Sequence, residues 1–449
     1  MNDTFFFYDL ETSGLDARGD RIMQFAGQRT DMELNPIGEG VNLMVRLADD
    51  TLPSPGAIGV TGITPQMTVA DGITEAELAK FLYAEAFTPG TCALGYNTVR
   101  FDDEFLRHLF WRNFYDSYEW QWRDGRSKWD MLDVVRMCRA LRPEGIEWPV
   151  DKDGKETNRL ELLTKLNGLE HEAAHDALSD VRATIAVARM LRERQPQLFA
   201  WLYKMRDKKE LMRMINLEEK KPFVYVSGRY AGEFHKATVG FPLSSGRHGN
   251  VLIYDLRHDP EEVAKAENPR GLFPVVKELH YGRCPAVAPL QVLESGDGWG
   301  RIGLTREVVE GNLRKLLAMP ELAERARSEA EEGKEWPAAV DAESALYDGF
   351  LDGRDRVKCD AVRNATEKSL ADFHPEFDDE RLPDLLVHYK GRNYPQTLAE
   401  GEAEAWEKYR AERLGRQSAK FLAELEGVKD AFLKEELRLW YEGLSEVDG

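Results

Sequence analysis

The chain has 449 residues, 42% of them hydrophobic and 10% aromatic, so it is long and apolar enough to form two or three globular domains. No apolar run reaches membrane-spanning length, no basic-then-apolar leader begins the chain, and the four cysteines lack C-x-x-C spacing, so we expect a cytoplasmic protein with no membrane partner. The formal net charge of −20 excludes a uniformly basic nucleic-acid-binding surface, but it leaves room for a groove lined locally with Arg and Lys.

The first strand that the sequence predicts, residues 4–12, ends in two carboxylates. Residues 5–8 form an aromatic run typical of a buried strand, and a Ser-Gly turn follows it. Asp9 and Glu11 are two residues apart, so on a strand both side chains point to the same face. Adjacent carboxylates repel each other unless a cation lies between them, which indicates a site for a hard divalent metal. Asp-x-Glu also occurs by chance, so this interpretation needs partner residues elsewhere.

The next elements predict an antiparallel meander followed by alternating helices and strands. We expect strands at 21–29 and 40–45, a capped amphipathic helix at 74–87, and a buried strand at 92–96. This order predicts an α/β fold built on a mixed sheet.

A second carboxylate cluster, Asp102, Asp103 and Glu104, follows the strand at 92–96. One interpretation is helix capping, because an acidic side chain satisfies the free N–H groups at the start of the helix that runs to Trp111. The other is metal binding. The two are compatible if Asp103 caps the helix while Asp102 faces a metal.

A third cluster lies at the start of a long helix that ends near Arg194. Asp176 is a good N-cap, which places His175 on the entry loop and Asp180 inside the helix. Asp180 stands between apolar neighbours, where it has no evident structural role. A lone His beside a helix start is more often a surface residue, but the acidic clusters already found favour a functional role for this one.

Together, Asp-Leu-Glu-Thr, Asn-x-x-x-Phe-Asp and His-Asp-Ala-x-x-Asp resemble the three motifs of the DEDDh exonucleases in the DnaQ-like, RNase H-related superfamily. The segments 95–104 and 142–146 and the long C-terminal extension resemble the bacterial exodeoxyribonuclease I family over essentially the whole chain. The resemblance implies a processive 3′ to 5′ exonuclease that degrades single-stranded DNA to nucleoside 5′-monophosphates in DNA repair and recombination. We expect an RNase H-like exonuclease domain at 1–195, a small SH3-like β domain with flanking helices at 196–336, and a C-terminal helical domain at 337–449.

The residue types in these motifs specify a two-metal phosphodiester hydrolysis. Four carboxylates can hold two Mg2+ ions about 3.5 to 4 Å apart, and oxygen ligands favour Mg2+, or Mn2+ as a substitute, over zinc. We expect Asp9 to bridge both ions. Glu11, Asp102 and Asp180 would complete their coordination. His175 is expected to take the proton from the attacking water, because the pKa of histidine lies near the working pH.

Several residues are expected to contact the DNA strand. The resemblance implies that Arg159 contacts the substrate near the active site and that Glu11 also contacts the terminal sugar. Residues 107–129 interleave aromatic rings with arginines, which suits base stacking and phosphate binding, although many of these rings must belong to the core. The alternative for each arginine is a surface ion pair. The other expected contacts are Arg107, Tyr118, Trp122, Arg136 and Arg142.

The chain changes character after residue 196. A basic helical piece at 204–213 either helps to hold the strand or is a solvated face, and five expected strands follow it at 223–227, 238–243, 250–256, 273–280 and 286–290. From Thr305 onward the chain is expected to be helical, with an apolar core stripe at Phe421, Leu425, Val428 and Phe432. Helical arms around the exonuclease core would enclose the strand and slow its dissociation between cuts.

The resemblance also implies a protein partner, the acidic tail of single-stranded DNA-binding protein, for which Arg306, Arg314 and Lys315 form a candidate basic patch. We expect the enzyme itself to be a monomer. Two rival hypotheses stay open. A DEDDh exoribonuclease or a proofreading-type exonuclease has the same motifs, but such relatives are typically little more than the catalytic domain. A non-catalytic single-strand DNA-binding protein would keep mutually repelling carboxylates without benefit.

Overall fold

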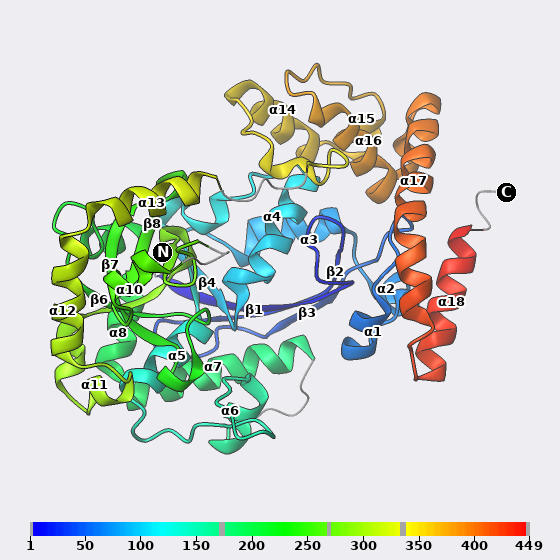
Figure 1. Cartoon of the computed structure of the whole chain (residues 1–449). Helices are drawn as coiled ribbons and strands as arrows, with labels where there is room; N and C mark the ends of the chain where they lie inside the picture. The colour runs from blue at the N-terminus through cyan, green and yellow to red at the C-terminus, as the bar shows by residue number, and fades with distance from the viewer. Residues whose placement is uncertain (1–2, 170–175, 267–270, 333–337, 446–449) are drawn as a thin grey trace.

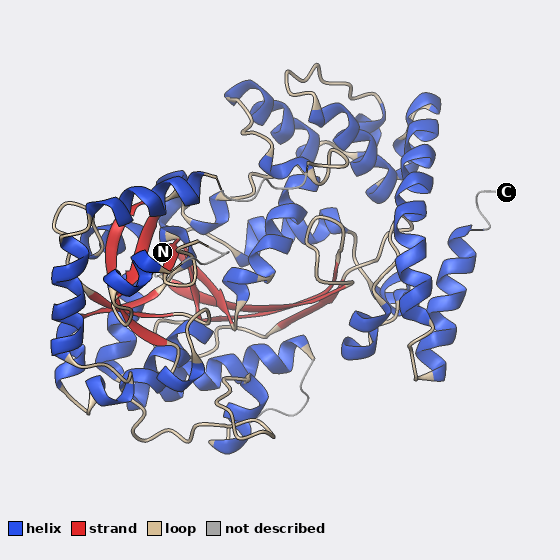
Figure 2. Cartoon of the chain, in the orientation of Figure 1, coloured by secondary structure: helices blue, strands red, loops and turns tan. Residues whose placement is uncertain are grey.

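The computed structural model describes residues 3–169, 176–266, 271–332 and 338–445. Two five-stranded sheets contribute to one large hydrophobic core, and helices cover them (Figures 1 and 2). The helices of the last hundred residues lie at the opposite end of the molecule from the second sheet (Figure 1). Within the described ranges, no helix is both long and apolar enough to cross a bilayer.

The first sheet has the strand order β3-β2-β1-β4-β5, with β1 in the centre. β1, β2 and β3 form the expected antiparallel meander, whereas β4 and β5 run parallel to β1. The predicted mixed sheet is therefore confirmed. Its strands are β1 (Thr4–Thr12), β2 (Ile22–Thr30), β3 (Val41–Met44), β4 (Thr91–Gly95) and β5 (Ser127–Asp130).

Helices flank this sheet, and the expected capping box at the start of α3 is present. Thr74 Oγ1 accepts a hydrogen bond from the Glu77 backbone N–H at 3.2 Å, and Glu77 Oε2 accepts one from the Thr74 N–H at 2.8 Å. The predicted helix extends past Phe81 as a single π-helical turn. The α-helices here are α1 (Pro55–Thr61), α2 (Pro65–Asp71), α3 (Glu75–Phe81), α4 (Asp102–Arg112), α5 (Met131–Leu141), α6 (Leu160–Leu166), α7 (Ala177–Arg194), α8 (Pro196–Met205) and α9 (Lys208–Met214).

The second sheet is antiparallel throughout, with the order β10-β6-β7-β8-β9. Its strands are β6 (Phe223–Val226), β7 (Ala237–Ser245), β8 (Val251–Asp255), β9 (Val276–Leu279) and β10 (Ala286–Pro289), so all five expected strands are confirmed. The accompanying helices are α10 (Pro260–Lys265), α11 (Gly298–Arg301), α12 (Arg306–Leu317) and α13 (Pro320–Glu331).

The last part of the chain is helical, as expected, but its predicted core stripe is partly wrong. Phe421 and Leu425 are buried, whereas Phe432 is 65% exposed. The reason is that α17 ends at Leu425 and a turn precedes α18, so helical spacing does not continue across the gap. The helices are α14 (Gly353–Asn364), α15 (Glu367–Ala371), α16 (Arg381–Asn393), α17 (Glu400–Leu425) and α18 (Ala431–Ser445).

Candidate active site

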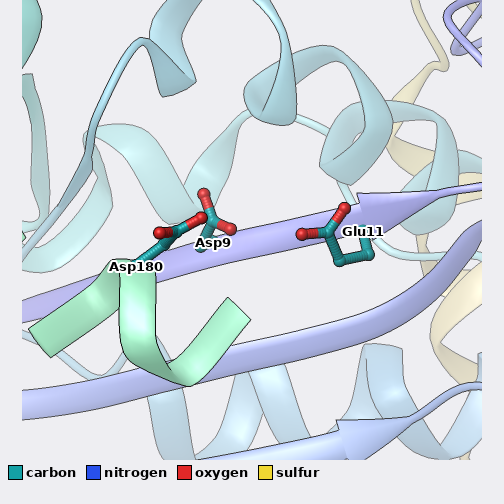
Figure 3. A group of neighbouring side chains, drawn as sticks. All are labelled: Asp9, Glu11 and Asp180. Atoms are coloured by element: carbon teal, nitrogen blue, oxygen red, sulfur yellow. The ribbon is translucent and has the colours of Figure 1, made fainter. Parts of the chain in front are cut away.

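The end of β1 and the start of α7 bring three carboxylates together. Asp9 and Glu11 lie on one face of β1, paired in register with Ala26 and Gln24 of β2. α7 packs across β1 and β2, and Asp180 lies near its N-terminus. Each of the three carboxylates offers an oxygen atom, and these atoms all lie within 4.8 Å of one another (Figure 3). The structure thus brings together three of the four acidic residues that the sequence motifs single out.

Burial and like-charge repulsion raise the pKa values of Asp9 and Glu11. Burial raises the pKa of Asp9 well above its ordinary value, and the neighbouring carboxylates raise it further, with Asp102 first among them. The pKa of Glu11 is raised to about 7, mainly by burial and then by the charge of Asp180. All the donors are carboxylate oxygen atoms, which suit a hard divalent cation, and a bound cation would remove the repulsion. The residues present therefore fit a metal site.

Asp102 approaches this cluster as the first residue of α4. β4 ends at Gly95, where a Cβ would lie 2.4 Å from the carbonyl oxygen of Tyr8, so glycine permits the close approach of the two strands beside Asp9. Asp102 is buried, and burial raises its pKa well above the ordinary value. Among the described residues, it is not one of the three whose oxygen atoms meet within 4.8 Å. Its charge nevertheless acts on Asp9, so it borders the same site.

Asp103 does not cap α4, and that expectation is wrong. Its Oδ1 accepts a hydrogen bond from Tyr8 Oη at 2.7 Å, and its Oδ2 accepts one from Lys128 Nζ at 2.6 Å. The residue in the capping position is Phe101, which makes no side-chain cap. Because Tyr8 is on β1 and Lys128 is on β5, Asp103 connects the start of α4 to the sheet. The neighbouring Asp102 is held beside Asp9 as a result.

Asp130, at the end of β5, supports the turn before α4. Its carboxylate accepts hydrogen bonds from the backbone N–H groups of Asn97 at 3.0 Å, Val99 at 3.2 Å and Leu132 at 2.9 Å. Burial raises the pKa of Asp130 to about 7. The sequence analysis missed the roles of both Asp130 and Lys128. A lysine inside a short buried strand was the signal that could have found Lys128.

The expected general base, His175, lies outside the described residues. The residue after it behaves as predicted, because Asp176 caps α7 by accepting a hydrogen bond from the Ser179 N–H at 3.0 Å.

Arg159 precedes α6 and presents a side chain that is 73% exposed, with Glu161 3.9 Å away. The backbone before it is anchored: Arg139 Nη1 donates to the Thr157 carbonyl at 2.5 Å, and Tyr96 Oη donates to the Asn158 carbonyl. An exposed guanidinium on an anchored backbone is suited to bind a ligand, and the expected substrate contact of Arg159 stays a prediction.

The aromatic segment divides into core and surface. Trp122 is 65% exposed, so its ring is open to a ligand. Arg107 is 12% exposed, forms an ion pair with Glu104, and lies 5.7 Å from the centre of the Tyr118 ring. The buried rings of this segment are Phe110, Trp111, Phe114, Trp120 and Trp129.

Arg136 and Arg142 also have partners within the protein. Arg136 Nη1 donates to Asp133 at 2.7 Å. Arg142 Nη2 donates to Ser295 Oγ at 2.7 Å and to the Val292 carbonyl at 3.0 Å, which connects α5 to the segment after β10. Neither charge is isolated, so a ligand phosphate would share it with these groups.

Three known protein families match successive parts of the chain. Residues 6–188 match the Exonuclease family, residues 206–329 match the Exonuclease I SH3-like domain, and residues 340–439 match the Exonuclease I C-terminal domain. The predicted order of an RNase H-like exonuclease domain, an SH3-like domain and a helical C-terminal domain is thereby confirmed.

The chain is similar over most of its length to curated and solved proteins. It is 37% identical to exodeoxyribonuclease I of Haemophilus influenzae (94% of this chain, 93% of the relative) and 39% identical to that of Escherichia coli (91% and 90%). The solved structure of E. coli Exonuclease I in complex with a dA16 oligonucleotide has a TM-score of 0.92 at 36% identity and covers 99% of this chain and 100% of its own. An SSB/Exonuclease I structure in complex with an inhibitor has a TM-score of 0.89 at 36% identity, with complete coverage of both chains.

Proposed function

The chain belongs to the bacterial exodeoxyribonuclease I family, and on that premise we propose that it removes nucleoside 5′-monophosphates processively from the 3′ end of single-stranded DNA. Each of the proposed domains, 1–195, 196–336 and 337–449, contains one of the three matched regions, which supports these boundaries. We also propose a monomeric, cytoplasmic enzyme that acts in DNA repair and recombination.

The observation that carries the proposal is the cluster of Asp9, Glu11 and Asp180 at the end of the central strand. The pKa of Glu11 is raised to about 7, by burial first and then by the charges of Asp180 and Asp176. Burying carboxylates this close together costs free energy unless a cation binds between them. Asp102 borders the same site.

The proposed reaction is hydrolysis of the terminal phosphodiester. Two Mg2+ ions, or Mn2+ in their place, would lower the pKa of the attacking water and neutralise charge on the departing oxygen. Asp9, from its place between the other carboxylates, would contribute to both ion sites, and Glu11, Asp102 and Asp180 to one each. His175 would accept the proton of the water, and Glu11 would also contact the terminal sugar.

The proposed path of the strand starts at Arg159, whose exposed guanidinium would donate to a phosphate oxygen. Trp122 would stack on a base. Arg107, Tyr118, Arg136 and Arg142 would contribute further along the path, with their charges shared with the internal partners described above. The SH3-like and C-terminal domains would retain the strand between cuts.

The proposed protein partner is the acidic tail of single-stranded DNA-binding protein, and the SSB/Exonuclease I structure supports this assignment. Two of the three cations of this candidate patch form ion pairs within the chain. Arg306 pairs with Glu294, and Lys315 Nζ lies 2.5 Å from Asp259, whereas the Arg314 side chain is exposed. A tail peptide would therefore compete with these acids. Fluorescence anisotropy with an Arg314→Glu variant measures this binding.

The experiment that tests the function compares single-stranded DNA, duplex DNA and single-stranded RNA, each labelled at the 5′ end, with Mg2+ or with EDTA. We expect that only the single-stranded DNA shortens from its 3′ end, and that EDTA or the Asp180→Ala substitution stops the reaction. Equal digestion of RNA would favour the exoribonuclease hypothesis instead. Binding of single strands without cleavage would show a non-catalytic DNA-binding protein.

A further inference from the structure

A network of buried charges joins the exonuclease domain to the C-terminal domain. Its four arginines and three carboxylates have side chains that are at most 5% exposed. Glu343 of the C-terminal domain lies between the two domains: its Oε2 accepts from Arg21 Nη2 at 2.5 Å, and its Oε1 accepts from Arg392. The members are Arg21, Asp50, Glu75 and Arg112 from the exonuclease domain and Glu343, Arg392 and Arg413 from the C-terminal domain.

On one side, this network reaches the loop that follows β1, the strand that carries Asp9 and Glu11. Arg21 closes that loop, because its carbonyl accepts from the Ser13 N–H at 2.8 Å and its N–H donates to Ser13 Oγ at 2.8 Å. Ser13 is two residues beyond Glu11. Arg413 contacts the same loop, where its Nη2 donates to the Gly19 carbonyl at 2.5 Å. The C-terminal domain therefore holds the loop from two places.

On the other side, the segment 338–347, which carries Glu343, contacts α4. Trp111 Nε1 donates to the Ala342 carbonyl at 2.9 Å, and Tyr347 Oη donates to Glu104. Glu104 is two residues from Asp102. One end of α4 thus borders the cluster of catalytic carboxylates, while its side is bound to the C-terminal domain.

We propose that Glu343 is a positioning residue for the cleavage reaction, acting through Arg21 on the loop beside Glu11 and through the segment 338–347 on the helix that carries Asp102. The C-terminal domain accordingly contributes to the rate of each cut, in addition to retaining the strand. The physical reason is that catalytic ligands must be held within a fraction of an ångström, by supporting groups that are themselves fixed. This inference rests on the proposed exonuclease function.

The test separates the rate of one cut from retention of the strand. Removal of the first 3′ nucleotide is followed in a single turnover, with excess enzyme, saturating Mg2+ and a 5′-labelled single strand of about 30 nucleotides, which spans several binding positions. Nucleotides removed per encounter are counted separately, with unlabelled DNA as a trap. We expect Glu343→Gln to slow the first cut about tenfold and Tyr347→Phe about threefold, since misplacement of this kind is costly to rate.

A double variant, the Tyr347→Phe variant and a surface control distinguish positioning from loss of stability. Glu343→Gln removes one of the carboxylates that neutralise the buried Arg21 and Arg392, which leaves Asp50 beside both, and lowers the melting temperature. In the double variant Arg21→Met/Glu343→Gln, one of those cations is gone, so we expect the melting temperature to recover while the first cut stays slow. Tyr347→Phe leaves the charges intact and is expected to melt like the wild type. Arg438→Gln, on the surface of α18, is the control with an unchanged rate.

Three results would count against the proposal. Fewer nucleotides per encounter with a normal first cut would mean that the C-terminal domain only retains the strand. Recovery of both stability and rate in the double variant would mean that Glu343 acts through stability alone. A first-cut rate equal to that of the wild type in Tyr347→Phe would mean that the contact between α4 and the C-terminal domain does not contribute to cleavage. If the wild-type enzyme removes no nucleotide at all, the proposed function itself fails and the inference fails with it.

Discussion

The replacement Lys128→Met tests how the sheet holds the start of α4. Lys128 Nζ lies 2.6 Å from Asp103 Oδ2, and the two side chains are 7% and 1% exposed. Two unit charges at that distance attract each other by about 6 kcal/mol at an effective dielectric constant of about 20. Much of this attraction offsets the cost of dehydrating both groups. Removal of one partner still costs about 3 to 5 kcal/mol, because the other charge stays buried. Tyr8 continues to donate to Asp103, so we expect the lower end of this range.

The assay is denaturation in urea, monitored by tryptophan fluorescence. The free energy of unfolding is taken from the transition in which the exonuclease domain unfolds and is compared between variants. The double variant Asp103→Asn/Lys128→Met removes both charges, so it is expected to recover most of the loss. The first-cut rate of Lys128→Met is measured alongside, and we expect it to fall, since Asp103 adjoins Asp102.

A loss below about 1 kcal/mol would mean that the pair of Lys128 and Asp103 stabilises the protein no more than a solvent-exposed ion pair does. A variant that loses the expected stability but cuts at the wild-type rate would refute the claim that the pair positions Asp102.

Glu11, Trp122 and Arg159 each give a further prediction. The pKa of Glu11 is raised from 4.5 to about 7, so the folded metal-free protein holds this proton more tightly than the unfolded chain, and the stability of the metal-free protein falls as the pH rises through that range. Glu11→Gln should therefore raise the melting temperature of metal-free protein at pH 8 while it abolishes cleavage. Trp122→Ala should weaken single-strand binding by about 1 to 3 kcal/mol in fluorescence anisotropy, with an unchanged melting temperature because the ring is exposed; an unchanged affinity would exclude stacking. Arg159→Ala should slow the first cut and reduce the slope of log affinity against log salt by about 0.7, whereas an unchanged slope would mean that this side chain binds no phosphate.

The parts of the site that could be predicted are those that depend on local geometry. Asp9 and Glu11 share a face because strand side chains alternate, and Asp176 caps α7 because its side chain reaches back to the next turn. The capping prediction for Asp103, which lies in α4, failed because its actual partner, Lys128, is on β5. That contact requires the parallel pairing of β4 and β5, which no local pattern encodes.

The buried charge network was beyond sequence reasoning for a similar reason. Arg21 and Glu343 are separated by 322 residues, and charged side chains are ordinarily expected at the surface. The prediction that Phe432 belongs to an apolar core stripe failed for a local reason. Helical spacing was assumed to continue across the turn between α17 and α18, where the helical register is lost.

Anomalous diffraction from crystals of the full chain soaked in Mn2+ tests directly whether the carboxylates at the end of β1 hold the ions that cleave DNA. We expect two peaks, both in contact with Asp9, with Glu11, Asp102 and Asp180 as the other ligands. A second acidic group in the described ranges, Asp352, Asp355 and Asp378, also has oxygen atoms within 4.8 Å of one another. It already has a cationic neighbour, because Lys358 Nζ lies 3.0 Å from both Asp355 and Asp378. Manganese at that group alone, with no peak at Asp9, would mean that the carboxylates at the end of β1 do not hold the metal ions.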